Sequence, residues 1–475
     1  MKRNTAIFIL STVIASSMIA QDLKYIEYDT DLISGAVYKE RRERVMKETG
    51  PESVILLYAA PEHMRNNDVE YQYRQDDNFY YLTGFTEPNS VLALVPKGIS
   101  VPDPDDSAKT LTVTEILFVR AKNPQREHWN GRNYGPAGAM KLRGFQYATT
   151  VDRFQQMMGM MMFRGGAKYL YVPPFASDFT GEIAETMQPV QALIDRRPSV
   201  ELRDPSGLIK KMRAIKSPEE IEMITKASKI SALAHKQAMM SCEPGMYEYE
   251  LQAVYEYVYR KNGMEYNAYP CIVGAAENSV VLHYNTVRRK INNGDIVLTD
   301  CGGEYHWYAT DITRTFPANG RFSPAQKSIY EIVLAAQKAA IARIKPGASW
   351  SDVSAAAAEV VEDGLLKIGI VKQKNNREYR RFFTHGLGHP VGLDVHDVGG
   401  SPLEAGMVYT VEPGIYIQEG AAGVSPEYYN IGVRIEDTIL VTQNGSNILS
   451  ADAPREIDEI EKLMKKKGIG NQGLD

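Results

Sequence analysis

The pattern of hydrophobic and polar residues predicts short apolar strands in both halves of the chain. In the first half, residues 53–60 and 91–95 form apolar runs of strand length. In the second half, residues 295–299, 407–411 and 432–441 do the same. Together with the helical segments between them, these runs predict domains of mixed α and β structure.

Helix starts are the clearest local signals in the second half. In residues 217–220 (SPEE), the serine is a favourable N-cap, the proline suits the first helical position and the last glutamate completes a capping box. A helix is therefore expected from this segment to about Met240. Residues 323–326 (SPAQ) predict a second helix, to about Ile344, and Ser351 opens an alanine-rich third.

The length and the first residues of the chain bear on its organisation and its destination. A chain of 475 residues exceeds the usual size of one domain. Lys2 and Arg3 precede an uncharged apolar run, and Ala20 stands before polar residues. Residues 1–20 are therefore expected to be a signal peptide that directs export to the periplasm or the exterior, with cleavage near Ala20. An uncleaved anchor and a plain N-terminal helix are the alternatives, because Met18 fits the small-x-small cleavage rule poorly.

Changes of pattern divide the rest of the chain into three parts. Residues 21–205 form the predicted N-terminal domain, and residues 206–448 form a second domain of mixed α and β structure. Residues 449–475 are a charged tail, expected to be a solvated helix.

The composition is that of an ordinary globular chain, with 44% hydrophobic and 24% charged residues. The formal net charge is −5, from 54 basic and 59 acidic residues, so no nucleic-acid partner is expected. An odd, sparse set of cysteines is not a disulfide framework. Cys242, Cys271 and Cys301 are therefore expected to be buried small hydrophobic residues.

Asp300 and Asp311 are the first candidates for chemistry. Asp300 ends an apolar run, where a buried carboxylate needs a partner. If the chain folds back between Tyr305 and His306, the two aspartates lie directly opposite each other, with Cβ atoms about 5 Å apart. Carboxylates this close repel unless a proton or a cation lies between them. The alternative is a turn at residues 302–303 (GG) that leaves Asp311 exposed.

Histidines cluster further along the chain. His385, His389 and His396 are three of the eight histidines and fall within twelve residues. The glycines and the proline among them argue against a continuous helix, so this is not the helical zinc signature His-Glu-x-x-His. The glycine spacing does not match a dinucleotide fingerprint either. Three clustered histidines flanked by glycines favour a site over isolated structural histidines.

Two glutamates complete the candidate set. Glu412 ends an apolar strand, and Glu436 shares a strand face with Arg434, with Val433 and Ile435 on the other face. Alone, a glutamate beside an arginine would suggest a plain salt bridge, but four strand-borne acids with a histidine indicate a metal site. Oxygen ligands with one nitrogen suit manganese or related divalent ions, and four carboxylates balance two of them. Two such ions can hold a bridging water, lower its pKa and polarise a carbonyl.

The candidate residues lie in longer motifs that together resemble aminopeptidase P, the Xaa-Pro aminopeptidase branch of the pita-bread metallopeptidases. The similarity covers most of the chain after the predicted signal peptide. It implies an α/β N-terminal domain followed by an α+β pita-bread catalytic domain, a curved antiparallel sheet with outer helices. The motifs are residues 74–88 (RQDDNFYYLTGFTEP), 300–316 (DCGGEYHWYATDITRTF), 385–398 (HGLGHPVGLDVHDV), 411–417 (VEPGIYI) and 433–437 (VRIED).

The resemblance implies a dinuclear metal site. Asp300 and Asp311 would ligate metal, with Asp311 bridging. His389 and Glu412 would ligate the second ion, and Glu436 would bridge. Glu412 would also act as general base and proton shuttle. Two divalent ions, with Mn²⁺ the expected identity, follow as cofactors.

The resemblance also implies substrate-binding residues. His283 and His396 would face the substrate from opposite sides and stabilise the tetrahedral intermediate. The proline pocket would involve His385, Tyr416 and Arg434. Trp129 resembles a tryptophan that reaches the active site of a neighbouring subunit, so a homo-oligomer is expected. His306 has no implied role and is expected to be a solvated turn residue.

The expected activity is hydrolysis of the Xaa-Pro bond at the N-terminus of peptides with proline at position 2, by a metal-bridging hydroxide. A prolidase-like Xaa-Pro dipeptidase would share the metal site but select two-residue substrates. A metal-dependent hydrolase of another small substrate and a non-catalytic peptide-binding module are further alternatives. The intact ligand set argues against the last of these.

Overall fold

The computed structural model describes residues 26–471, except residues 107, 165, 174–189, 191, 193–194 and 197–198. The predicted signal peptide, residues 1–20, lies outside the described residues. The chain divides into two compact units, Met1–Lys210 and Lys211–Asp475. The division falls within helix α8 (Ser206–Ala214), whereas the pattern of the sequence placed it at residue 205.

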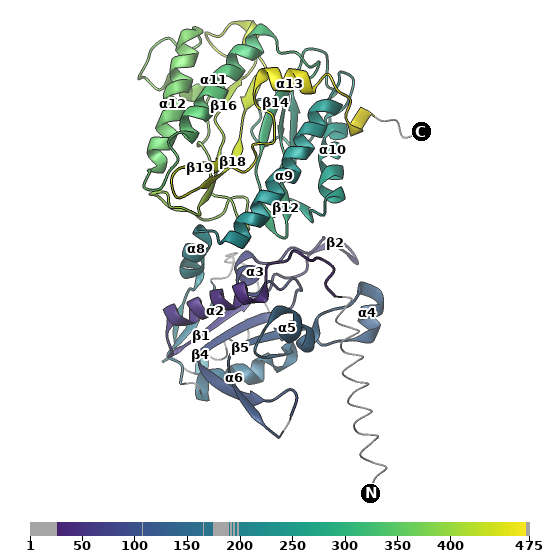
Figure 1. Ribbon diagram of the computed structural model, residues 1–475, viewed down its shortest axis with the longest axis vertical. Helices are drawn as coiled ribbons and strands as arrows, with labels where there is room; N and C mark the ends of the chain where they lie inside the picture. Colours follow the sequence, from purple (N-terminus) through teal and green to yellow (C-terminus); the bar gives the residue numbers. More distant parts are fainter. Residues whose placement is uncertain are drawn as a thin grey trace. The chain divides into compact units, whose positions relative to one another are not determined.

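The N-terminal unit is built on a six-stranded mixed sheet in the order β6-β5-β4-β1-β7-β8. Strand β4 pairs antiparallel with β1 and β5, whereas the outer pairs β5–β6, β1–β7 and β7–β8 are parallel. Helices α2, α5 and α6 pack against the sheet (Figure 1), which gives the predicted α/β architecture. The elements are α2 (Gly35–Thr49), β1 (Ser53–Tyr58), β2 (Met64–Asn66), β3 (Val69–Glu70), α3 (Asp77–Thr83), β4 (Val91–Pro102), β5 (Thr110–Val119), α4 (Pro124–Asn130), α5 (Gly135–Arg143), β6 (Ala148–Thr150), α6 (Phe154–Arg164), β7 (Tyr169–Tyr171) and β8 (Glu201–Arg203).

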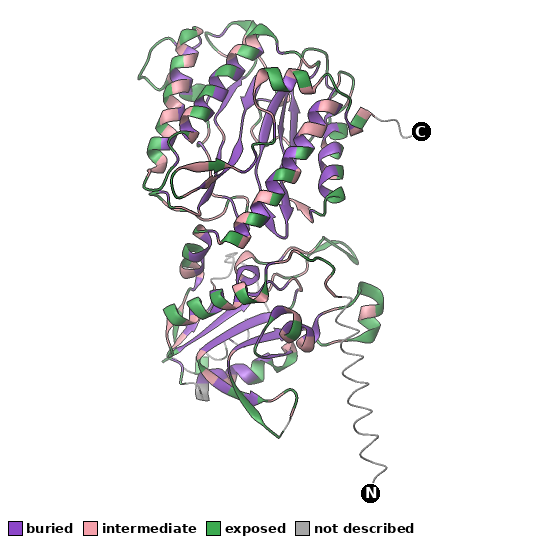
Figure 2. Ribbon diagram, viewed as in Figure 1, coloured by how far each residue is buried: buried purple, intermediate pink, exposed green. Residues whose placement is uncertain are grey.

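The second unit has antiparallel strand pairs with helices outside them, which is the predicted α+β arrangement (Figure 1). Its strands are buried along most of their length, while its helices alternate buried and exposed residues (Figure 2). The elements are α9 (Pro218–Ser241), α10 (Glu248–Lys261), β9 (Tyr266–Asn267), β10 (Ile272–Ala275), β11 (Ile296–Asp300), β12 (Gly303–Tyr305), β13 (Tyr308–Ala309), β14 (Thr313–Pro317), α11 (Pro324–Ile341), α12 (Trp350–Lys367), β15 (Val408–Val411), β16 (Gly414–Ile417), β17 (Ile431–Arg434), β18 (Asp437–Val441), β19 (Ser446–Ile448) and α13 (Ile457–Leu463).

The predicted helix starts are confirmed where a capping box is present. Ser217 caps α9 and Ser323 caps α11, each in a capping box with a proline in the first turn. The third start was placed slightly late, because Ser349, not Ser351, caps α12. The predicted strand 432–441 is two strands, β17 and β18, which separate at Ile435 and Glu436.

The hairpin that carries the two aspartates differs from the prediction. The chain turns at His306 and Trp307, both with positive φ (47° and 73°), rather than between residues 305 and 306. Asp300 therefore pairs with Thr313, and not with Asp311. His306 is buried, with Nδ1 3.2 Å from Glu265 Oε1, so the expectation of a solvated turn residue was wrong.

The charged C-terminal segment contains a helix, α13, as predicted, but this helix packs on the second unit and is not simply solvated. Ile460 in α13 is fully buried, and Arg314 donates to the main-chain oxygens of Ala453 and Pro454.

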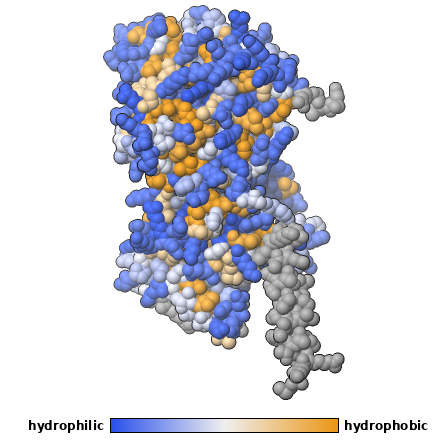
Figure 3. Space-filling view, in the orientation of Figure 1, coloured by the Kyte–Doolittle hydropathy of each residue, from blue (hydrophilic) through white to orange (hydrophobic). Residues whose placement is uncertain are grey.

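The three cysteines are buried and form no disulfide, as predicted. On the face shown in Figure 3, apolar residues are interspersed among hydrophilic ones. Within the part of the chain that the structure describes, no helix has the length and apolarity needed to cross a membrane.

Candidate functional site

The second unit contains a cavity of about 490 Å³ between its strands and the loops around them. Strand ends place the acids there: Asp300 ends β11, Glu412 follows β15, and Glu436 lies between β17 and β18. The predicted site residues that line the cavity are His283, Asp300, Asp311, His385, His389, His396, Glu412, Arg434 and Glu436. Tyr416 and Trp129 are the two predicted residues that do not line it.

Asp300 and Asp311 lie close together even though they are not a cross-strand pair. The hydroxyl oxygen of Tyr269 lies within hydrogen-bonding distance of both, at 2.6 Å from Asp300 Oδ1 and 2.5 Å from Asp311 Oδ1. One hydroxyl has one proton, so it cannot satisfy both carboxylates at once. Arg434 Nη2 lies 2.6 Å from Asp300 Oδ2 and offsets part of the charge. Tyr269 was missed in the sequence because no motif marks it.

His389 directs its Nε2 at two of the acids. Its Nδ1 lies 3.1 Å from the carbonyl oxygen of Pro390, which can only accept, so Nδ1 carries the proton. Nε2 then faces Asp311 Oδ2 at 3.4 Å and Glu412 Oε1 at 3.6 Å. Once Nε2 gives up its proton, a nitrogen lone pair lies beside two carboxylates, which is a metal-ligand arrangement with the orientation set by the other ring nitrogen.

Electrostatics in the cavity also favour a cation. Burial and the nearby Asp311 raise the pKa of Asp300 to about 6, and burial raises the pKa of Glu412 to about 7. Burial, reinforced by the neighbouring acids, raises the pKa of Glu436 well above its usual value. Burial lowers the pKa of His389, but Asp311 and Glu412 outweigh it and raise the pKa to about 9. Without a metal the cavity therefore keeps protons on several of its acids and on His389, and a divalent cation can take the place of these protons.

The geometry fits divalent metal ions. One ligand atom each from Asp311, His389 and Glu436 lie within 4.8 Å of one another. Glu436 Oε2 accepts from Thr313 Oγ1 at 2.7 Å, but the buried Oε1 has no hydrogen-bond partner among the described residues. A buried, unpaired carboxylate oxygen is costly unless a cation binds it. Asp311, His389 and Glu436 can therefore hold a divalent metal ion.

Three of the predicted substrate residues form one polar cluster beside the acids. Tyr416 Oη lies 2.8 Å from His385 Nε2 and accepts from Arg434 Nη1 at 2.9 Å. Burial and Arg434 lower the pKa of His385 to about 4, so its ring is neutral near pH 7. The cluster presents a neutral imidazole to the cavity.

The other predicted substrate residues differ in their surroundings. His283 lies on a loop, and the ring of His396 lies 4.1 Å from that of His389. The residue after His396, Asp397, forms buried ion pairs with Arg213 (2.6 Å) and Lys216 (3.3 Å), which restrain this part of the loop. Trp129 belongs to the N-terminal unit and is 84% exposed, so its expected contact with another subunit stays a prediction.

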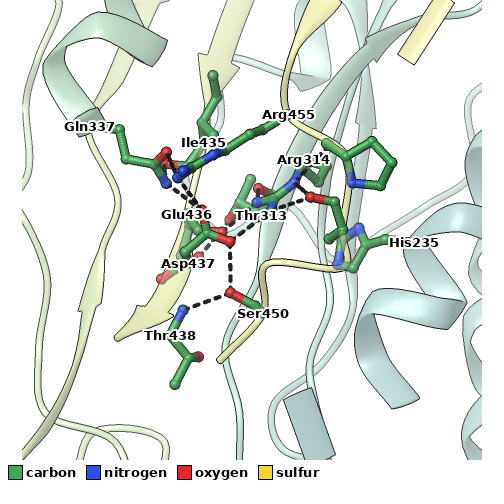
Figure 4. Close-up of polar contacts among 12 residues, drawn as sticks. His235, Thr313, Arg314, Gln337, Ile435, Glu436, Asp437, Thr438, Ser450 and Arg455 are labelled. Atoms are coloured by element: carbon green, nitrogen blue, oxygen red, sulfur yellow. Dashed lines mark hydrogen bonds and ion pairs between the residues drawn. The ribbon is translucent and has the colours of Figure 1, made fainter. Parts of the chain in front are cut away.

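A buried polar network supports the strands that carry the acids, and sequence reasoning missed it. Asp437 accepts from Arg314, Ser450, Gln337 and Arg455 at 2.6 to 3.0 Å. Figure 4 shows how these side chains surround it. The same Arg314 donates to the main-chain oxygen of Glu436, and Gln337 donates to the main-chain oxygens of Val411 and Ile435. The network thus holds the backbone at Glu412 and Glu436. Its only sequence signal is Asp437 beside Glu436.

An antiparallel sheet that brings four acids and a histidine to one cavity is the arrangement of a metallopeptidase. Residues 222–443 match metallopeptidase family M24, and residues 38–171 match the N-terminal domain of aminopeptidase P. An Xaa-Pro aminopeptidase of Haemophilus influenzae is 39% identical, over 90% of this chain and 96% of its own. One from Escherichia coli K12 is 36% identical, over 91% and 98%.

Solved structures agree with the sequence relatives. Aminopeptidase P from Escherichia coli with the inhibitor Pro-Leu has a TM-score of 0.83 and 37% identity, covering 91% of this chain and 98% of that one. Aminopeptidase PepP from Pseudomonas aeruginosa has the same values. The chain therefore belongs to metallopeptidase family M24, in its aminopeptidase P branch.

Proposed function

We propose that this protein is a metal-dependent aminopeptidase that hydrolyses the bond between the first residue of a peptide and a proline at position 2. The observation that carries the proposal is the cavity in which Asp300, Asp311, His389, Glu412 and Glu436 converge. Similarity to Xaa-Pro aminopeptidases over nine tenths of the chain supports this choice of substrate.

The cofactor follows from the ligand set. Asp300 and Asp311 would hold one divalent ion and His389 and Glu412 a second, with Asp311 and Glu436 contacting both. Mn²⁺ is the proposed identity, because four carboxylates and one imidazole suit it. When bound, such ions supply Lewis-acid polarisation of the scissile carbonyl and lower the pKa of water.

Glu412 is the proposed proton carrier. In the metal-free cavity burial raises its pKa to about 7. As a carboxylate at the cavity wall, it would accept a proton and return it to the leaving amine. His283 and His396 would donate to the carbonyl oxygen as charge develops on it, from opposite sides of the cavity. Donors placed where charge develops contribute more to the transition state than to substrate binding.

Proline recognition would depend on shape, because the Xaa-Pro amide has no N–H to donate. The ring of His385 lines the proposed pocket, and Tyr416 Oη, 2.8 Å from its Nε2, orients that ring from behind. Arg434 could bind the terminal carboxylate of a dipeptide, as a dipeptidase requires. Its guanidinium, however, already contacts Asp300 and Tyr416, which favours an aminopeptidase over the dipeptidase alternative.

Purified protein is expected to cleave Xaa-Pro-Yaa peptides with higher kcat/KM than Xaa-Pro dipeptides. Replacing the proline by alanine should lower kcat/KM by about 10- to 200-fold. This corresponds to about 1–3 kcal/mol of transition-state binding, the scale of a shape-selected apolar pocket. A chelator should abolish cleavage, and added Mn²⁺ should restore it. Preference for the dipeptide would support the prolidase-like alternative, and cleavage that survives complete metal removal would contradict the metal-dependent function.

We also propose that the protein is exported. Lys2, Arg3 and the apolar run to Ala20 motivate the proposal. Mass spectrometry of the protein from its native cells should find a mature N-terminus near Gln21. A cytoplasmic chain that still carries residues 1–20 would disprove it.

A further inference from the structure

A buried carboxylate in the second unit stands outside the proposed catalytic residues. Glu248 is the first residue of α10, and its side chain is fully buried. Its two oxygens accept four hydrogen bonds, all from residues 275–289. The donors are Ala275 N (2.9 Å) and Asn278 Nδ2 (3.0 Å) on Oε1, and Tyr284 Oη (2.9 Å) and Arg289 N (2.9 Å) on Oε2.

The segment that Glu248 holds carries a wall of the cavity. Residues 279–289 contain no helix or strand, so individual hydrogen bonds rather than a regular ladder hold them. His283 and Asn285 line the cavity, and Tyr284 between them donates to Glu248. The four donors lie on both sides of His283 along the chain. The carboxylate therefore fixes the two ends of the loop that presents this histidine.

We propose that Glu248 is a positioning residue that holds His283 at the wall of the cavity. The inference rests on the proposed function, in which His283 donates to the developing oxyanion. Glu248 does not line the cavity, so it acts through the loop and not on the substrate. Its place in the first turn of α10 suits a negative charge, because the helix N-terminus is positive.

The four donors explain why a carboxylate is needed. In Glu248→Gln, the amide keeps one oxygen and gains an NH₂ group on the other side. Asn278 can turn its amide and Tyr284 can rotate its hydroxyl, but the backbone N–H of Ala275 or of Arg289 cannot become an acceptor. Whichever way the glutamine lies, its NH₂ faces one of these two backbone groups. The loop must then shift to relieve the conflict.

The test compares Glu248→Gln alone and in a His283→Ala background, with an Xaa-Pro-Yaa tripeptide as substrate. Alone, the substitution should lower kcat at least about tenfold with little change in KM, because His283 acts in the transition state. In the His283→Ala background, it should lower kcat less than about twofold, because the positioned group is gone. An equally large loss in both backgrounds would overturn the proposal.

Glu250→Gln is the matched control. Glu250 lies on the same turn of α10 and accepts from Tyr247 N at 2.6 Å, but it is exposed and its carboxylate accepts no hydrogen bond from residues 275–289. Glutamine can still accept that bond, so kcat should stay within about twofold of the unsubstituted protein. Metal content should be unchanged in both variants. Loss of metal in Glu248→Gln would assign the effect to the metal site and overturn the proposal.

Hydrogen exchange separates this inference from the proposed function. The backbone amides of Ala275 and Arg289 should exchange at least about tenfold faster in Glu248→Gln than in Glu250→Gln, because a local opening costs less once the carboxylate is lost. Equal exchange in the two variants would overturn the positioning role. If the unsubstituted protein fails to cleave the tripeptide, the proposed function fails, and the exchange rates still decide whether Glu248 holds the loop.

Discussion

Asp311→Asn should reduce peptidase activity by at least about 1,000-fold and lower the metal content of the folded protein. Asp311 lies 3.4 Å from His389 Nε2 and shares the hydroxyl of Tyr269 with Asp300. A carboxylate between two divalent ions neutralises both, and an amide of the same shape lacks the charge. Several kcal/mol of transition-state stabilisation depend on such ions, which corresponds to this fold-change.

Activity and metal content should be measured together on the purified variant. Circular dichroism should confirm that the chain is folded. Asp352→Asn provides the control, because Asp352 is an exposed aspartate in the first turn of α12, away from the cavity. The control should keep its metal and its activity. Full activity in Asp311→Asn would rule out the proposed metal site.

Asp437→Asn should destabilise the second unit by about 3–5 kcal/mol, the usual cost of breaking a buried ion pair. Asp437 and Arg314 are both fully buried, with Nη2 2.7 Å from Oδ1. Asparagine removes the countercharge of Arg314 and turns an NH₂ group towards the donors that surround this position. The melting temperature of the second unit should fall by roughly 6–20 °C.

Differential scanning calorimetry measures this shift, with Glu456→Gln as the control. Glu456 forms a 2.6 Å ion pair with Lys338, but both side chains are about half exposed. Exposed pairs contribute about 0–1 kcal/mol, so the control should melt within a few degrees of the unsubstituted protein. Equal shifts in the two variants would show that the buried network has no special role in stability.

Local features of this fold were predictable, because their causes lie within a few residues. Ser217 and Ser323 start helices since each serine and the residue three places on satisfy each other's backbone groups. The acids at strand ends were also recognisable, because Asp300 and Glu412 interrupt apolar runs. The predicted residues that line the cavity were found by motif, and the structure brings them together.

Features that depend on tertiary contacts were not predictable. The hairpin turn uses His306 and Trp307 at positive φ, whereas glycine or asparagine usually marks such a turn. Because the turn was predicted one residue too early, Asp311 was predicted as the cross-strand partner of Asp300. The structure instead pairs Asp300 with Thr313. Arg314 bonds to residues more than 100 positions away, so no local pattern reveals its role.

The contact between Arg314 and the C-terminal segment has a consequence for biosynthesis. Arg314 donates to the main-chain oxygens of Glu436, Ala453 and Pro454. It can therefore form all of these hydrogen bonds only after residues near the end of the chain have been synthesised. Because translation runs from the N-terminus, the ligand-bearing strands are made before the segment that steadies them. A nascent chain would therefore acquire its metal late. Under the export proposed above, such timing would leave metal capture to the compartment where folding finishes.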